Sequence, residues 1–119
     1  MQKMNPEVKK KWVAALRSGD YKQGQGRLKS SENEYCCLGV LCDIYKNEVG
    51  GKWQEEFSRS TFIDIDGAKS QCVPSPAIRN WAGIDTASPQ IEDYTTAIMA
   101  NDSYEYDFNT IANLIEANL

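Results

Sequence analysis

The chain contains one long apolar run, from Tyr35 to Tyr45, whose pattern changes halfway along. Its first residues are typical of the end of a strand. Its second half follows the spacing i, i+3, i+4 and i+7 of one helical face, occupied by Leu38, Leu41, Cys42 and Tyr45. We therefore predict a buried strand-to-helix unit, with a helix over residues 38–46, around which the rest of the chain packs.

Start and stop signals predict three more helices. Asn5 can cap a helix that begins at Pro6 and ends at Ser18-Gly19. A short helix over residues 76–82 has Ser75 as its cap and Gly83 at its end, and Asp107 caps a final helix over residues 108–118. Apolar stripes predict their buried faces, made of Val8, Trp12, Ala15, Leu16, Ile78, Trp81, Ala82, Phe108, Ile111, Ala112, Ile115 and Leu119.

Turn residues between extended runs predict two hairpins. The first pairs residues 26–29 with residues 34–37. The second pairs residues 60–65 with residues 68–73, and Asp66-Gly67 between them favours a type I′ turn.

The remaining segments carry weaker patterns. Residues 53–57 suit either a strand or a helical turn, and residues 94–100 suit either a strand or a helix, with the helix favoured. Polar residues predict loops over 85–93 and 101–107. The overall expectation is an α+β fold in a single domain over residues 1–119, with a small antiparallel sheet or hairpins packed against three to five helices.

Composition supports a globular, soluble chain of ordinary make-up. Its 119 residues are 41% hydrophobic and 25% charged, enough for one core. No apolar run approaches the roughly 20 residues that span a bilayer, and residues 1–6 lack the apolar core of a signal peptide. We expect a cytoplasmic protein with reduced thiols and no membrane partner.

Charge is unevenly distributed along the chain. Residues 1–30 carry eight basic and two acidic groups, whereas residues 31–119 carry five basic and fifteen acidic ones. Such asymmetry can steer a charged partner to one face. The simpler interpretation, which we favour, is a solvated lysine-rich helix and hairpin. Neither charge nor composition gives a strong signal for nucleic-acid binding.

Catalytic and metal-binding chemistry has little support. The chain has no histidine, which removes the usual general base and the imidazole ligands of metals. Its cysteines do not follow a zinc-binding spacing, so we interpret all four as buried small hydrophobes rather than ligands or disulfides: Cys36, Cys37, Cys42 and Cys72. We predict no catalytic residues, no metal and no cofactor, although carboxylate or lysine chemistry stays open.

One segment could bind an anion. Two glycines flanked by cations could cradle a phosphate through backbone N–H groups, and a nearby tyrosine could stack on a base. The candidate ligand-binding residues are Lys22, Gly24, Gly26, Arg27, Lys29 and Tyr35. Tyr21 and Trp53 could extend the stacking face. The alternative is a hairpin entry in which the glycines serve only backbone geometry.

The order of several segments resembles a family of small, uncharacterised accessory proteins of tailed bacteriophages. The most specific is Cys36-Cys37-Leu38-Gly39-Val40-Leu41-Cys42-Asp43, and the others are residues 5–7, 12–23, 101–102 and 108–116. The resemblance implies an origin but no activity or site residues.

Small phage proteins of this kind often inhibit host proteins or bind host signalling nucleotides. The leading hypothesis is an accessory protein in the host cytoplasm that antagonises a host process, such as a defence, by binding a host protein without catalysis. The alternatives are a binder or sponge of a signalling nucleotide and, after it, a small enzyme.

Overall fold

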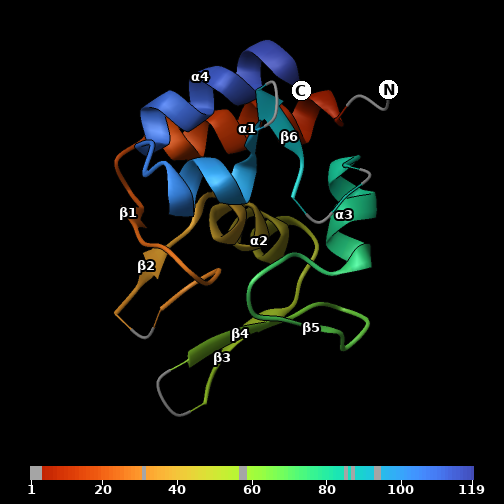
Figure 1. The fold of residues 1–119 in the computed structure, drawn as a ribbon. Coiled ribbons are helices and arrows are strands. Elements are labelled where there is room, and N and C mark those ends of the chain that lie inside the picture. Colours follow the sequence, from red (N-terminus) through yellow and green to blue (C-terminus); the bar gives the residue numbers. More distant parts are fainter. Residues whose placement is uncertain (1–3, 31, 57–58, 85, 87, 93–94) are drawn as a thin grey trace.

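Helices from opposite ends of the sequence lie side by side in the computed structural model (Figure 1). These are α1 (Pro6–Arg17) and α4 (Phe108–Asn118). The structure describes residues 4–30, 32–56, 59–84, 86, 88–92 and 95–119. Both helices begin where the sequence predicts, since Asn5 Oδ1 accepts from the Glu7 and Val8 N–H groups and Asp107 Oδ1 accepts from that of Thr110.

Helix α2 (Cys37–Glu48) forms the centre of the molecule, as the apolar run predicts. It lies between the α1–α4 layer and the largest sheet (Figure 1), and every residue from Cys37 to Tyr45 is buried. It begins one residue earlier and ends two residues later than predicted. Cys36 caps it, with Sγ 3.4 Å from the Gly39 amide nitrogen, and Trp12 of α1 donates its indole N–H to the Cys37 carbonyl at 2.8 Å.

A glycine lets the chain approach α2 closely. A Cβ added to Gly39 would lie 1.8 Å from the Leu28 carbonyl oxygen, well inside any real contact. The Leu28 side chain is itself fully buried. The backbone around Leu28 therefore packs directly on the helix, and position 39 has no room for a side chain.

The strands form three small sheets. The first pairs β1 (Lys22–Gln23) with β2 (Glu34–Tyr35) in parallel. The second is antiparallel, in the order β3 (Lys52–Glu56), β4 (Arg59–Ile63) and β5 (Lys69–Ser70). The third is the antiparallel pair β6 (Gln90–Glu92) and β7 (Thr95–Thr96). With α3 (Pro76–Ala82) and the π-helix η1 (Met99–Ser103), this confirms an α+β fold with five helices in the described part of the chain.

The first predicted hairpin is partly confirmed. Lys29 and Tyr35 form an antiparallel bridge, flanked by hydrogen bonds from the Ser30 N–H to the Glu34 carbonyl at 2.8 Å and from the Cys36 N–H to the Leu28 carbonyl at 3.1 Å, but residues 26–28 are not a strand. The β2 strand also pairs in parallel with β1, which the sequence analysis missed. The physical reason is that the Tyr35 carbonyl accepts from the Gly24 N–H at 2.8 Å, which holds the chain before Gly26 against β2.

The second predicted hairpin exists, but its turn is not type I′. A type I′ turn needs positive φ at both central residues, and of Asp66 and Gly67 only Gly67 has it (φ 85°). The buried carboxylate of Asp64 organises the turn, because its Oδ1 accepts from the backbone N–H groups of Asp66 and Ala68. Its Oδ2 accepts from the Ser75 hydroxyl, so Ser75 occupies the cap position of α3 without capping it through its side chain.

The ambiguous and loop segments resolve mostly into regular structure. Residues 52–56 are strand β3, and Phe57 lies outside the described residues. The favoured helix over 94–100 is partly wrong, because β7 precedes two helical residues and the start of η1, and Tyr94 is not described. The predicted loops over 85–93 and 101–107 contain β6 and most of η1, respectively.

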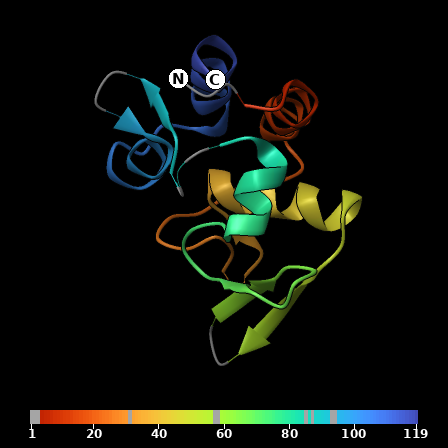
Figure 2. The same ribbon diagram turned by 90° about the vertical axis from the view of Figure 1, so that its right-hand side faces the viewer.

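The predicted apolar faces are mostly buried. Ala15, Trp81 and Leu119 are exceptions, being partly buried at the edge of the core. Figure 2 shows α4 between α1 on one side and η1 with β6 and β7 on the other. No helix among the described residues is long and apolar enough to cross a membrane.

Candidate functional site

The predicted anion-binding residues lie in and around the β1–β2 pair but do not form an open cradle. Lys22 pairs with Glu34 across the two strands, at 3.2 Å. The Gly24 N–H donates to the Tyr35 carbonyl, so it is not available to a phosphate. Gly26 is exposed with φ 87°, and Arg27 is half-buried. Ligand binding by this segment stays a prediction. The two glycines do not provide the pair of free backbone N–H groups on which that prediction was based.

Lys29 and Tyr35 are brought together with Trp53. The Lys29 Nζ lies 5.6 Å from the Tyr35 ring centroid and 5.3 Å from that of Trp53, within the range of cation–π attraction. The two rings are 6.0 Å apart and nearly perpendicular, and Tyr21 packs edge-on against Tyr35 at 5.0 Å. The three aromatic residues proposed from sequence thus form one half-buried cluster with a cation above it.

Asp43 of α2 lies beneath this aromatic cluster. Its carboxylate accepts from the Tyr21 hydroxyl at 2.6 Å and the Trp53 indole at 3.0 Å, and it pairs with Lys46 at 3.3 Å. Burial alone would raise the pKa of Asp43, but these donors and the lysine charge outweigh it, so the pKa lies below its usual value. Burial, followed by the hydrogen bond to Asp43, raises the pKa of Tyr21. Each partner is satisfied, which makes the cluster a rigid support.

Three of the four cysteines are buried, as predicted, and Cys72 is not. Its segment runs along the surface past Gly26, whose carbonyl lies 3.7 Å from the Cys72 Sγ, so its interpretation as a buried hydrophobe is wrong. Burial raises the pKa of Cys36 to about 12 and those of Cys37 and Cys42 well above the usual value. The described residues contain no group of three or more ligands that could hold a metal ion.

A buried asparagine joins the segments around α2. Asn101 of η1 is fully buried. Its Oδ1 accepts from Gln23 Nε2 at 2.9 Å and from the Cys37 N–H at 3.3 Å. Its Nδ2 donates to the Gly24 carbonyl at 2.8 Å and to Asp102 at 2.7 Å. This side chain therefore ties the β1 segment, the start of α2 and the π-helix together.

The segment after Asn101 presents an acidic, tyrosine-bearing surface, here called the tyrosine loop (residues 102–107). Tyr104 is 49% exposed, and its ring lies 5.8 Å from that of Tyr106. Glu105 between them is exposed and has φ 53°, a conformation uncommon for a residue with a side chain. The carbonyl of Tyr106 accepts from Gln23 Nε2 at 2.7 Å, and the Tyr104 and Tyr106 N–H groups bond to η1. The loop is thereby held in one shape.

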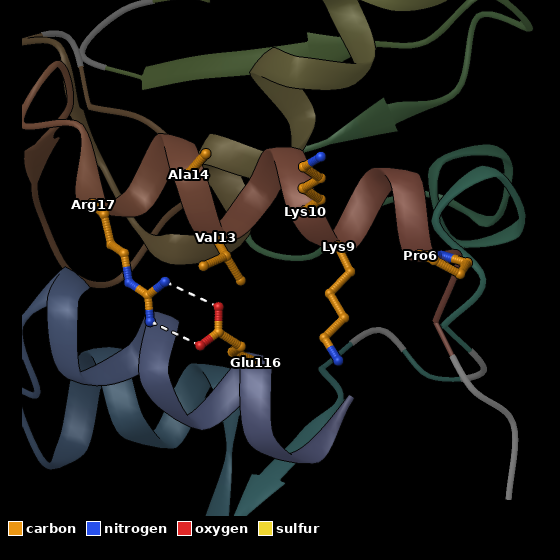
Figure 3. Close-up of a pocket in the computed structure, with 7 residues that line it drawn as sticks. All are labelled: Pro6, Lys9, Lys10, Val13, Ala14, Arg17 and Glu116. Carbon is orange, nitrogen blue, oxygen red and sulfur yellow. Dashed lines mark hydrogen bonds and ion pairs between the residues drawn. The ribbon is translucent and has the colours of Figure 1, made fainter.

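A groove of about 440 Å³ runs along α1 beside the last turns of α4 (Figure 3). Arg17, Val13 and Lys9 point from α1 toward α4 in this view. The Arg17 guanidinium engages both carboxylate oxygens of Glu116, at 3.0 and 3.4 Å, and Asn113 Oδ1 at 2.6 Å. The hydrogen bond and charge of Arg17, with the charge of Lys9, lower the pKa of Glu116. Sequence reasoning missed this groove.

A family model described as "Domain of unknown function (DUF8296)" matches residues 4–119. The chain belongs to this family. The matched region takes in the aromatic cluster, the tyrosine loop and the groove, so all three belong to the family domain. No curated protein and no solved structure matches the chain.

The most specific segment of the phage resemblance lies in the core. Cys36 to Asp43 form the cap and first two turns of α2, and all eight residues are buried. This segment therefore reflects packing around α2. A partner can contact surface features such as the tyrosine loop, but not these buried residues.

Proposed function

We propose that the protein is a phage accessory protein that antagonises a host process, such as a defence, by binding a host protein in the host cytoplasm without catalysis. The tyrosine loop carries this proposal. It combines an exposed tyrosine with the carboxylates of Asp102, Glu105 and Asp107. Tyrosine is enriched at the centre of protein interfaces, where it contributes large contact area.

The shape and charge of the loop favour a basic protein partner. Its hydrogen bonds to η1 and to Gln23 fix it before binding, which lowers the entropy lost in a complex. Three carboxylates complement a cationic surface and speed association with it. A host surface that binds nucleic acid has this character, and occupying it would block the host function.

The test is capture of a host protein followed by measurement with the purified partner. We expect Glu105→Lys to abolish capture and Tyr104→Ala to weaken binding by at least about tenfold, the effect of losing an interface anchor. Asp66→Lys is the matched control, because it makes the same charge change in the exposed β4–β5 turn. Wild-type protein should also displace a labelled oligonucleotide from the partner. Capture that is equal for the wild type and both loop variants would refute this function.

A second candidate function, binding of a signalling nucleotide, is favoured by Lys29 above the Tyr35 and Trp53 rings. A base stacked on one of these two rings would leave the Lys29 ammonium free to meet a phosphate. Titration calorimetry with a panel of nucleotides tests it. We expect Lys29→Ala and Arg27→Ala to weaken binding and Lys69→Ala, an exposed lysine of β5, to leave it unchanged. If no nucleotide in the panel binds, nucleotide binding is refuted and only the protein-binding proposal remains.

A further inference from the structure

The groove between α1 and α4 has the features of a site for a small ligand. Its volume of about 440 Å³ falls within the range of about 300–1,000 Å³ found for small-molecule pockets. Pro6, Val13 and Ala14 give it apolar lining. The methylene stems of Lys9 and Lys10 extend this lining, since lysine side chains cover apolar surface while keeping the ammonium group in water.

The charge of the groove selects an anion. Arg17 and Glu116 neutralise each other within it. Lys9 and Lys10 make no ion pair with any residue that the structure describes, so the lining has a positive balance. The two lysine side chains leave α1 in different directions (Figure 3), so an incoming anion would pair with one ammonium group without displacing an internal partner.

One wall of the groove is fixed in advance. The Arg17 guanidinium donates two hydrogen bonds to Glu116 (Figure 3) and a third to Asn113. Two parallel bonds of this kind fix the plane of a guanidinium as well as its position. A ligand then loses little free energy to the ordering of this wall.

We propose that this groove binds a small organic anion, a carboxylate or phosphate carried on an elongated apolar body. The apolar body lies along Val13 and Ala14, and the anionic group pairs with Lys9 or Lys10. Helix α1 from Pro6 to Arg17 is about 18 Å long at 1.5 Å per residue, which suits an extended ligand. This site is separate from the tyrosine loop and independent of the proposed host partner.

Defined probes test the proposal on the intact chain. Dodecanoate and dodecyl phosphate are titrated by amide NMR below their micelle concentrations, and dodecyltrimethylammonium is the cationic control of equal chain length. We expect the shift changes to centre on residues 9–17 and 113–116. The better of the two anions identifies the head group, and the cationic probe should bind at least about fivefold more weakly.

Paired variants separate charge from shape. Lys9→Gln with Lys10→Gln should weaken anion binding about fivefold, as expected for the loss of one exposed ion pair, and added salt should reduce the difference. The matched control is Lys52→Gln with Lys69→Gln, two exposed lysines of the sheet. Ala14→Trp should block the groove without changing charge, whereas Ala117→Trp, at an exposed position of α4 outside the groove lining, should not.

Several results would overturn the site. They are equal binding of the cationic probe, shift changes centred away from α1 and α4, and binding unaffected by both the lysine pair and Ala14→Trp. The site would also be refuted if neither anion bound at concentrations up to the millimolar range.

Discussion

Replacing Asn101 by Ala tests whether one buried side chain holds the centre of the fold together. The substitution removes four hydrogen bonds, and two of the groups left behind are buried backbone groups, the Cys37 N–H and the Gly24 carbonyl. Gln23 retains its bond to the Tyr106 carbonyl, and Asp102 is partly exposed to water. The cost therefore comes mainly from the two backbone groups.

The magnitude follows from these two groups. A buried polar group without a partner costs about 1–3 kcal/mol, so loss of the partner of both groups should lower the free energy of unfolding by about 2–6 kcal/mol. For a domain of this size, each kcal/mol lowers the melting temperature by roughly 3–5 °C. We expect the melting temperature to fall by roughly 6–30 °C, measured by circular dichroism and confirmed by urea unfolding.

The control for this variant is Asn80→Ala, because Asn80 is exposed on α3. It should change the free energy of unfolding by less than about 0.5 kcal/mol. Amide exchange should accelerate around Gly24 and the start of α2 in Asn101→Ala and not in the control. A loss below about 1 kcal/mol for Asn101→Ala would show that water replaces the side chain and that the site is not dry.

Three further predictions follow from the described contacts. Gly39→Ala should prevent stable folding, because its Cβ would lie 1.8 Å from the Leu28 carbonyl oxygen. In the control Gly67→Ala, the Cβ meets no atom within 4 Å, and the variant should lose only about 1–2 kcal/mol of stability because of its left-handed backbone. Equal melting temperatures for the two variants would disprove the close approach at Gly39. Because the folded pKa of Asp43 is lowered, its contribution to stability is present above its unfolded pKa of about 3.9 and is lost as pH falls through the folded pKa. Urea unfolding should therefore show the stability advantage of the wild type over Asp43→Asn shrinking between pH 5 and pH 2, and a constant difference would contradict this. In the native protein, only Cys72 of the four thiols should react rapidly with Ellman's reagent, and denaturant should release the other three; fast reaction of more than one would show that α2 opens.

The elements predicted correctly are those whose signals are local. Caps such as Asn5 and Asp107 bond to amides two or three residues away, so the sequence alone reveals them. The apolar face of α2 can likewise be predicted from the spacing of its apolar residues. The short β1 strand is different, because its position depends on Asn101, which bonds to the Gly24 carbonyl across 77 residues of sequence.

The candidate sites show the same division. The Lys29 and Tyr35 pairing was accessible because the two residues flank one turn. The groove was not, since its wall joins Arg17 to Glu116 across 99 residues. The exposure of Cys72 could not be predicted from its neighbours in the sequence either, because its short surface segment has no periodic pattern of apolar residues.

The pairing of α1 with α4 has a consequence for synthesis of the chain. The apolar stripe of α1 is synthesised about 90 residues before α4, one of the helices that it packs against. During translation, Trp12 can pack against α2 once α2 has emerged, but the side of α1 that faces α4 stays open until the residues of α4 have left the ribosome. A nascent chain at that stage exposes the apolar side of α1 that later contacts α4. It would therefore be the form most accessible to chaperones and proteases.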